Sequence, residues 1–181
     1  MSRAVAKSAG EGLDLVDLSE VAWSCLEAIA PPPSHLEVES DLATDLPFVL
    51  ADPGRLEEWV SRLLARGAEV VGRDWGAVTV GTGVLGIGRT PLARAELWTP
   101  FAERHHVFLE VHTTGPSIGP LSCGYVTRPF EARGFGPLDL AKARAGMAEY
   151  DGEVLVDPLA TAGCAVVLLL PYAAADLPAL S

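Results

Sequence analysis

The feature that most constrains this fold is a short apolar segment that runs into Asp52 and Pro53 and continues as a long amphipathic pattern. Aspartate is a preferred helix N-cap, and proline suits the first helical position because the N–H it lacks would have no partner there. Apolar residues then recur at helical spacing, namely Leu56, Trp59, Val60, Leu63 and Leu64. The pattern predicts a strand over residues 48–52 and a helix from residue 53 to about residue 70 with one buried face.

Further sequence patterns predict the other helices and strands of the domain. Asp17 and Glu20 have the spacing of a capping box, and the helix they begin carries Val21, Leu26 and Ile29 on one face before three prolines end it. Apolar runs predict strands over residues 35–40, 105–112, 153–157 and 164–171, two short strands with a glycine turn over residues 75–89, and a helix over residues 138–150. We therefore expect an α/β (α+β) two-layer sandwich, a mixed sheet with helices on one face.

Composition and charge exclude several kinds of partner. Hydrophobic residues make up 49% of the 181 residues, which is incompatible with a disordered chain. A formal net charge of -11 repels phosphate backbones and anionic lipid, so we expect neither nucleic acid nor membrane as a partner. Residues 1–12 are interpreted as a flexible tail and residues 13–181 as one domain. The start has no signal-peptide pattern, and the longest apolar run is too short to span a bilayer, which predicts a cytoplasmic location.

Several catalytic and binding motifs match the sequence, but the neighbouring residues that such motifs need in order to function are missing. The GxGxxG pattern at residues 81–86 is followed by Pro91 rather than by a helix. The GxSxG pattern at residues 115–119 would need a later histidine, and all four histidines come earlier. His105 and His106 would point to opposite faces of a strand. The three cysteines have no zinc-ligand spacing, so we expect no catalytic residue and no metal site.

The segment ATDLPFVLADPGRLEEWVSRLLARGAEVV resembles the entry to the first helix of the ATP-binding (GHKL-type) domain of sensor histidine kinases. Upstream, LDLVDLSEVAWSCLEAIAP and HLEVES are similar to the opening helix and strand of that family. Downstream, VFLEVHTTGPSIGP resembles its DxGxGI strand, RPFEARGFGPLDLAKARAGMAEYDGEV its lid, glycine box and next helix, and GCAVVLLLP its last strand. The resemblance covers nearly the whole chain in the family's order and implies a histidine-kinase ATPase-like fold.

The resemblance also implies that the nucleotide pocket is degenerate. Arg62 and Arg66 stand where the family has two asparagines, the second of which helps to hold magnesium, and a guanidinium cannot ligate a metal. Thr113 replaces the aspartate that accepts a hydrogen bond from adenine. Gly115 is retained, whereas a serine, Ser117, replaces the second glycine of that box. The phosphate-facing glycine box holds a proline without an N–H and an acidic side chain, at Pro137 and Asp139.

The hypothesis that follows is a non-catalytic regulatory or adaptor domain in two-component-type signalling, a pseudokinase domain with no cofactor. Its expected partner is a protein: a kinase, a response regulator or a second copy. Two alternatives stay open. One is a working ATP-binding, kinase-type domain with atypical ligands, and the other is an anion sensor that uses Arg62 and Arg66, one helical turn apart. Residues 115–136, in the place of the family's lid, carry Phe130 and Phe135, which either fill the vacant pocket or form a contact surface.

Overall fold

The computed structural model describes residues 12–28, 32, 34–71, 75–93, 95–101, 105–114, 137–157 and 163–172, with the backbone alone at residues 69–70, 137–140 and 163. Four expectations lie outside this range: the tail over residues 1–11, the position of Ile29 on its helix, the pocket residues Gly115 and Ser117, and the lid with Phe130 and Phe135.

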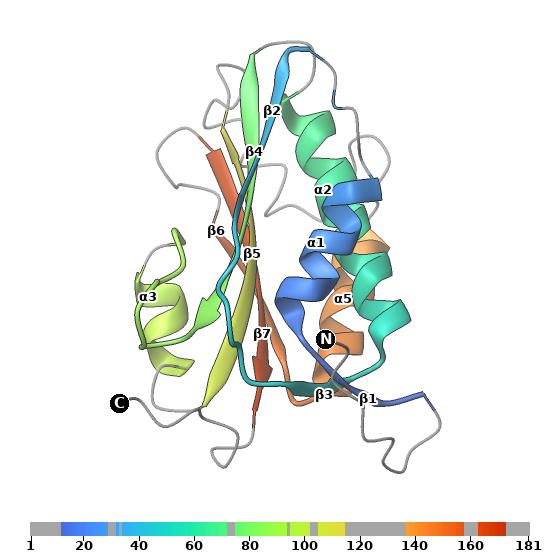
Figure 1. The fold of residues 1–181 in the computed structure, drawn as a ribbon, viewed down its shortest axis with the longest axis vertical. Helices are drawn as coiled ribbons and strands as arrows, with labels where there is room; N and C mark the ends of the chain where they lie inside the picture. Colours follow the sequence, from blue (N-terminus) through green and yellow to red (C-terminus); the bar gives the residue numbers. More distant parts are fainter. Residues whose placement is uncertain are drawn as a thin grey trace.

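The centre of the molecule is a five-stranded mixed sheet with the strand order β2-β4-β5-β7-β6 (Figure 1). The strands are β2 (Leu36–Asp41), β4 (Gly76–Val84), β5 (His106–Thr114), β6 (Glu153–Asp157) and β7 (Gly163–Pro171). β2 runs parallel to β4, and the other three pairings are antiparallel. A separate two-stranded ribbon joins β1 (Asp14–Val16) to β3 (Val49–Ala51). β1 was not expected from the sequence.

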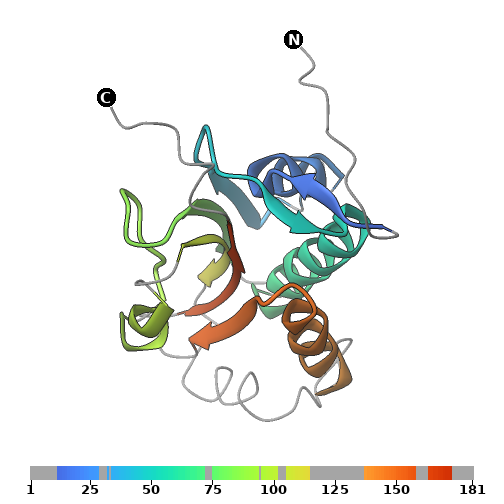
Figure 2. The same ribbon diagram turned by 90° about the horizontal axis from the view of Figure 1, so that it is seen from below.

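Three helices, α1 (Leu18–Ala28), α2 (Pro53–Val71) and α5 (Pro137–Ala148), lie on the same side of this sheet (Figures 1 and 2). The predicted two-layer α+β sandwich is therefore confirmed. The main core lies between the helices and the sheet and includes Leu56, Val60 and Leu64 of α2 together with Val80, Val111 and Leu168 of the strands.

The start of α2 is the one that Asp52 and Pro53 predict. The Asp52 carboxylate accepts a hydrogen bond from the Arg55 backbone N–H at 3.1 Å, as an N-cap does. The helical spacing predicts the buried face well, since Leu56, Val60 and Leu64 are buried completely or nearly so. Trp59 and Leu63 are half-buried and pack against the edge of the core.

The N-terminal helix α1 also begins at its predicted cap, where the Ser19 backbone N–H donates to the Asp17 carboxylate at 2.8 Å. Val21 lies on its buried face as expected, and Leu26 is half-buried beside the core. Leu18, Ala22 and Cys25 complete that buried face.

The prediction of two short strands with a glycine turn over residues 75–89 is right about the turn and wrong about the two strands, since within the described residues only a single bridge, from Val84 to Ile87, follows the first strand. Residues 76–84 form the single strand β4, and side chains of later residues pack closely over two of its glycines. A Cβ on Gly81 would lie 2.2 Å from the Arg89 guanidinium, and a Cβ on Gly83 would lie 2.7 Å from the Phe108 ring. The turn itself comes later, where Gly86 and Gly88 adopt positive φ angles of 80° and 69°.

The face of the sheet opposite the three helices, called here the outer face, is covered by residues 85–93 and 95–101, for which the sequence pattern predicts no helix. This segment includes the short helix α3 (Ala95–Trp98) and the 3-10 turn η1 (Thr99–Phe101), seen on the other side of the sheet in Figures 1 and 2. A second apolar cluster fills the space beneath it: Leu85, Ala93, Phe108, Ala165, Val167 and Leu169. β7 is therefore buried on both faces, as its unbroken apolar run indicates.

Candidate functional site

The positions that the resemblance assigns to a nucleotide pocket come from α2, the end of β5 and the start of α5. α2 lies directly on the sheet where β5 ends. A Cβ on Gly67 would lie 2.9 Å from the Thr113 methyl and 3.2 Å from a Val78 methyl, so no larger residue fits there without a shift. The structure therefore brings the α2 backbone beside Arg66 against Thr113, two positions 47 residues apart in the sequence.

Arg62 forms an ion pair with Glu58, one turn earlier on α2, and both side chains are about half exposed. An i,i+4 pair of this kind stabilises a helix by a few tenths of a kcal/mol, roughly 0.3–0.5 kcal/mol. Arg66 follows one turn later and is half-buried. Two guanidinium groups, which offer hydrogen-bond donors and no lone pair for a metal, therefore occupy successive turns of α2.

Thr113 is buried, with only 5% of its surface exposed. Its hydroxyl donates a hydrogen bond of 3.3 Å to the backbone carbonyl of Cys164, its partner residue on β7. The proton of this hydroxyl is therefore held within the sheet. A neutral hydroxyl in this position is a weaker acceptor than a carboxylate would be.

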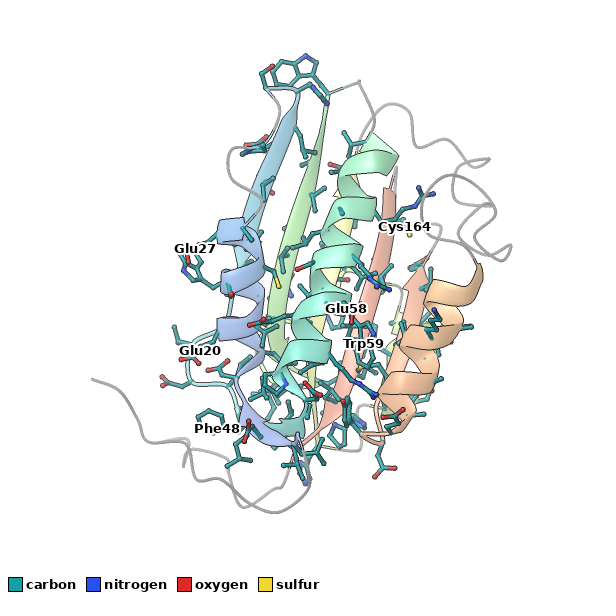
Figure 3. The ribbon with its side chains drawn as sticks, turned by 90° about the vertical axis from the view of Figure 1, so that its right-hand side faces the viewer. Glu20, Glu27, Phe48, Glu58, Trp59 and Cys164 are labelled. Carbon is teal, nitrogen blue, oxygen red and sulfur yellow. The ribbon has the colours of Figure 1, made fainter. Side chains whose placement is uncertain are left out.

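Pro137 and Asp139 lie in the first turn of α5. Their side chains, like all of Gly115 and Ser117, are outside the described residues. α5 is held against α2 by aromatic packing: a Cβ on Gly146 would lie 2.2 Å from Trp59, and the Trp59 and Tyr150 rings are 6.2 Å apart (Figure 3). Arg55 of α2 and Glu149, the residue after the end of α5, add an exposed ion pair of 2.5 Å.

The outer face holds a buried polar cluster that sequence reasoning missed. The Glu110 carboxylate, 1% exposed, accepts hydrogen bonds of 3.0 Å from the backbone N–H groups of both Leu92 and Ala93. Arg89 lies 3.6 Å from the same carboxylate, 2.6 Å from Asp41, and 5.4 Å from the centre of the Phe108 ring. The signal was present in the sequence: an acidic residue in the middle of the apolar run VFLEVH needs buried partners.

The histidines contribute to packing at the positions the structure describes. His105 contacts the Tyr172 ring at 5.6 Å, whereas His106 is buried against Phe101 at 6.0 Å, so the two neighbours do point to different surroundings. Burial lowers the pKa of His112, while the nearby carboxylates of Glu110 and Asp157 act to raise it. The imidazole of His112 is therefore biased toward its neutral form.

Within the described ranges, no group of three or more His, Cys, Asp or Glu side chains is placed to hold a metal ion. The two positions of α2 that would face magnesium and nucleotide in the family carry arginines, and these do not fit a metal. Among the helices that the structure describes, none is long and apolar enough to cross a membrane.

A mixed five-stranded sheet with three helices on one face, and α2 laid along the end of β5, is the α+β sandwich of the histidine-kinase catalytic domain. The chain has this fold. No protein-family model and no curated protein sequence matches it.

Several solved structures of histidine kinases are similar to this chain. The chain is similar to full-length ShkA in complex with AMPPNP, at 21% identity and a TM-score of 0.62, over 91% of this chain and 32% of ShkA. It is similar to the catalytic domain of histidine kinase ThkA in a nucleotide-free form, at 17% identity and a TM-score of 0.61, over 88% of this chain and 97% of that domain. It is similar to the mycobacterial sensor histidine kinase MprB, at 25% identity and a TM-score of 0.59, over 86% of this chain and 95% of that one. Likenesses at this identity establish the fold.

Proposed function

We propose that this chain is a regulatory or adaptor domain of two-component-type signalling, one domain over residues 13–181, in which the histidine-kinase-like site does not hold Mg-ATP. Its partner is a protein, which is a kinase, a response regulator or a second copy of the chain. The domain acts in the cytoplasm. The observation that carries the proposal is that arginines, Arg62 and Arg66, occupy the two α2 positions where the resemblance gives asparagines. Arg62 in addition forms an ion pair with Glu58.

The physical reason is the loss of the metal. Magnesium takes oxygen ligands in a near-octahedral arrangement and bridges the phosphates of a nucleotide to the protein. Arginine at both positions supplies no oxygen. Thr113 supports the same proposal, because its uncharged hydroxyl oxygen is a weaker hydrogen-bond acceptor than the carboxylate that the resemblance places there.

The fold itself favours one competing function. α2 and β5 meet as they would in a nucleotide-binding domain of this class, and ShkA has this fold in complex with AMPPNP. A histidine-kinase-type ATP-binding domain with atypical ligands is the alternative. In it the two guanidinium groups of Arg62 and Arg66 would meet the phosphates, which arginine binds well through charge-assisted hydrogen bonds. The same groups could serve a small anion in place of a nucleotide.

Titration with a fluorescent ATP analogue, with and without magnesium, separates these functions. We expect no saturable binding at millimolar nucleotide in either condition, and Arg66→Asn alone should not restore it, because Thr113, Pro137 and Asp139 remain. Binding that requires magnesium would refute the proposal in favour of the ATP-binding domain. Binding without magnesium that is lost in Arg62→Gln/Arg66→Gln would refute it in favour of an anion site.

A further inference from the structure

The strand β2 forms one edge of the five-stranded sheet, and among the described residues it pairs with β4 alone. An edge strand presents backbone N–H and C=O groups that can pair with the strand of another chain. Natural edges are often protected by charge, and β2 carries three acidic residues, Glu37, Glu39 and Asp41, at every second position.

Alternation places these three carboxylates on one face. Two contacts identify that face as the outer one. Glu39 accepts a hydrogen bond of 3.1 Å from the Thr79 hydroxyl, and Asp41 pairs with Arg89, which stacks on Phe108 of the outer cluster. The outer side of this edge therefore carries a row of three carboxylates held by a strand, of which Asp41 is already paired with Arg89.

The helix side of the same edge has a pocket with a mixed apolar and acidic lining. Trp23, Leu26 and Glu27 of α1 and Val38, Glu39 and Ser40 of β2 line a pocket of about 210 Å³ between helix and strand. Trp23 is 54% exposed, although a tryptophan side chain gains much from burial. Glu20 and Glu27 project from the side of α1 that faces away from α2, so acidic groups also flank this pocket (Figure 3).

We propose that this edge, composed of β2 and the pocket beside Trp23, binds an extended segment of a partner protein in which apolar and basic residues alternate. A strand added to β2 has a two-residue period, so one set of its side chains enters the pocket of Trp23, Leu26 and Val38. The other set meets Glu37 and Glu39. Lysine or arginine side chains in that set pair with these two carboxylates, and main-chain hydrogen bonds between the two strands add affinity.

The charge also decides against a second copy as the occupant. Two β2 edges paired with each other would bring acidic rows together, and like charges opposite one another destabilise a strand pair. The overall charge of -11 adds to that repulsion. The inference is independent of whether the domain binds nucleotide, because β2 and Trp23 are not part of the α2–β5 site.

The test uses the full chain and two labelled synthetic peptides, one alternating lysine with valine over about eight residues, about the length of an ordinary strand. The other has the same composition with the lysines and valines in separate blocks. Fluorescence anisotropy should show saturable binding of the alternating peptide, with the block peptide weaker by at least about tenfold, which corresponds to 1.4 kcal/mol. Equal binding of the two peptides would overturn the proposal in favour of unspecific charge attraction.

Variants locate the site. Trp23→Ala and Glu37→Lys/Glu39→Lys should each weaken the alternating peptide by about tenfold or more. The control Glu57→Lys/Glu96→Lys makes the same change in net charge at exposed positions of α2 and α3 and should leave binding within about twofold. If the double variant at the edge unfolds, Glu37→Lys alone decides, because it spares the Thr79–Glu39 hydrogen bond. An unchanged affinity in Trp23→Ala, or dimerisation of the chain through β2 in sedimentation, would overturn the proposal.

Discussion

The Thr113 methyl lies so close to the α2 backbone that a Cβ on Gly67 would stand 2.9 Å from it. Real Cβ atoms essentially never approach so closely, and Val78 confines the same space at 3.2 Å. The contact fixes how near the helix of the candidate site lies to the end of β5, and it explains why a glycine is found in the middle of a long helix.

The first prediction follows from this contact. A glycine-to-alanine change inside a helix ordinarily stabilises by up to about 1 kcal/mol. Gly67→Ala should do the opposite and destabilise by about 1–3 kcal/mol, because the packed neighbours must shift. Gly54→Ala in the first turn of α2 is the control, since its Cβ would meet only Asp52 at 3.4 Å. Urea unfolding of both variants measures the difference, and a stabilised Gly67→Ala would contradict the packing described.

The second prediction concerns the buried face of α2. Leu64 is 1% exposed in the main core, and Leu64→Ala should destabilise by about 2–5 kcal/mol. Leu63, its neighbour, is only half-buried at the border of the core, so Leu63→Ala should cost clearly less. Thermal and urea unfolding of the pair test the helical register. Equal losses in the two variants would mean that the face of α2 is rotated relative to the one described.

The third prediction concerns the buried carboxylate of Glu110. Glu110→Ala leaves two backbone N–H groups, of Leu92 and Ala93, without their acceptor and removes a charge that faces Arg89. Breaking such a buried set should cost about 3–5 kcal/mol. It should also make residues 85–101 more sensitive to limited proteolysis. Glu39→Ala, at an exposed position, is the control and should change stability by no more than about 0.5 kcal/mol.

The fourth prediction is a pH dependence. The pKa of His112 is lowered in the folded state below its ordinary value of 6.5, chiefly by burial. The unfolded chain therefore binds this proton more readily than the folded one. The stabilising contribution is complete above pH 6.5 and is lost as the pH falls below that value.

Melting temperatures in this pH window test the assignment. The wild type should lose more stability than His112→Gln between about pH 7 and pH 5. His105→Gln removes an exposed imidazole from the same stretch and should behave as the wild type does. An equal loss in wild type and His112→Gln would show that another group controls the acid response.

The main elements of the fold follow from local sequence signals. Asp52 and Pro53 predict the start of α2, and the apolar run at residues 164–171 predicts a strand buried on both faces. These signals depend on neighbours along the chain. The glycines of β4 were misleading for the opposite reason, because their neighbours come from later in the chain: the Arg89 guanidinium lies over Gly81 and the rigid Phe108 ring lies over Gly83. Nothing in the local pattern distinguishes such a glycine from one in a turn.

The candidate site is predictable in position and less so in its contacts. The resemblance places Arg62, Arg66 and Thr113 near one another, and Gly67 against Thr113 agrees with that placement. The ion pair of Arg62 with Glu58 is a local i,i+4 relationship. The bond from Thr113 to Cys164 depends on the register of β5 against β7, which no local pattern specifies. The acidic row on β2 and the exposed Trp23 acquire meaning only when β2 is known to be an edge.

The cover over the outer face also limits how this domain can be joined to others. Residues 85–93 and 95–101 cover this face of the sheet, and Glu110 and Arg89 hold them there. A neighbouring domain cannot pack against the sheet face itself without first displacing this ion pair and its apolar cluster. An association that leaves the described structure intact must therefore use the helical side, a sheet edge or the outward surface of the covering segment, and cannot reach the sheet face itself. The architecture of a larger assembly is in this sense restricted by one carboxylate in the middle of β5.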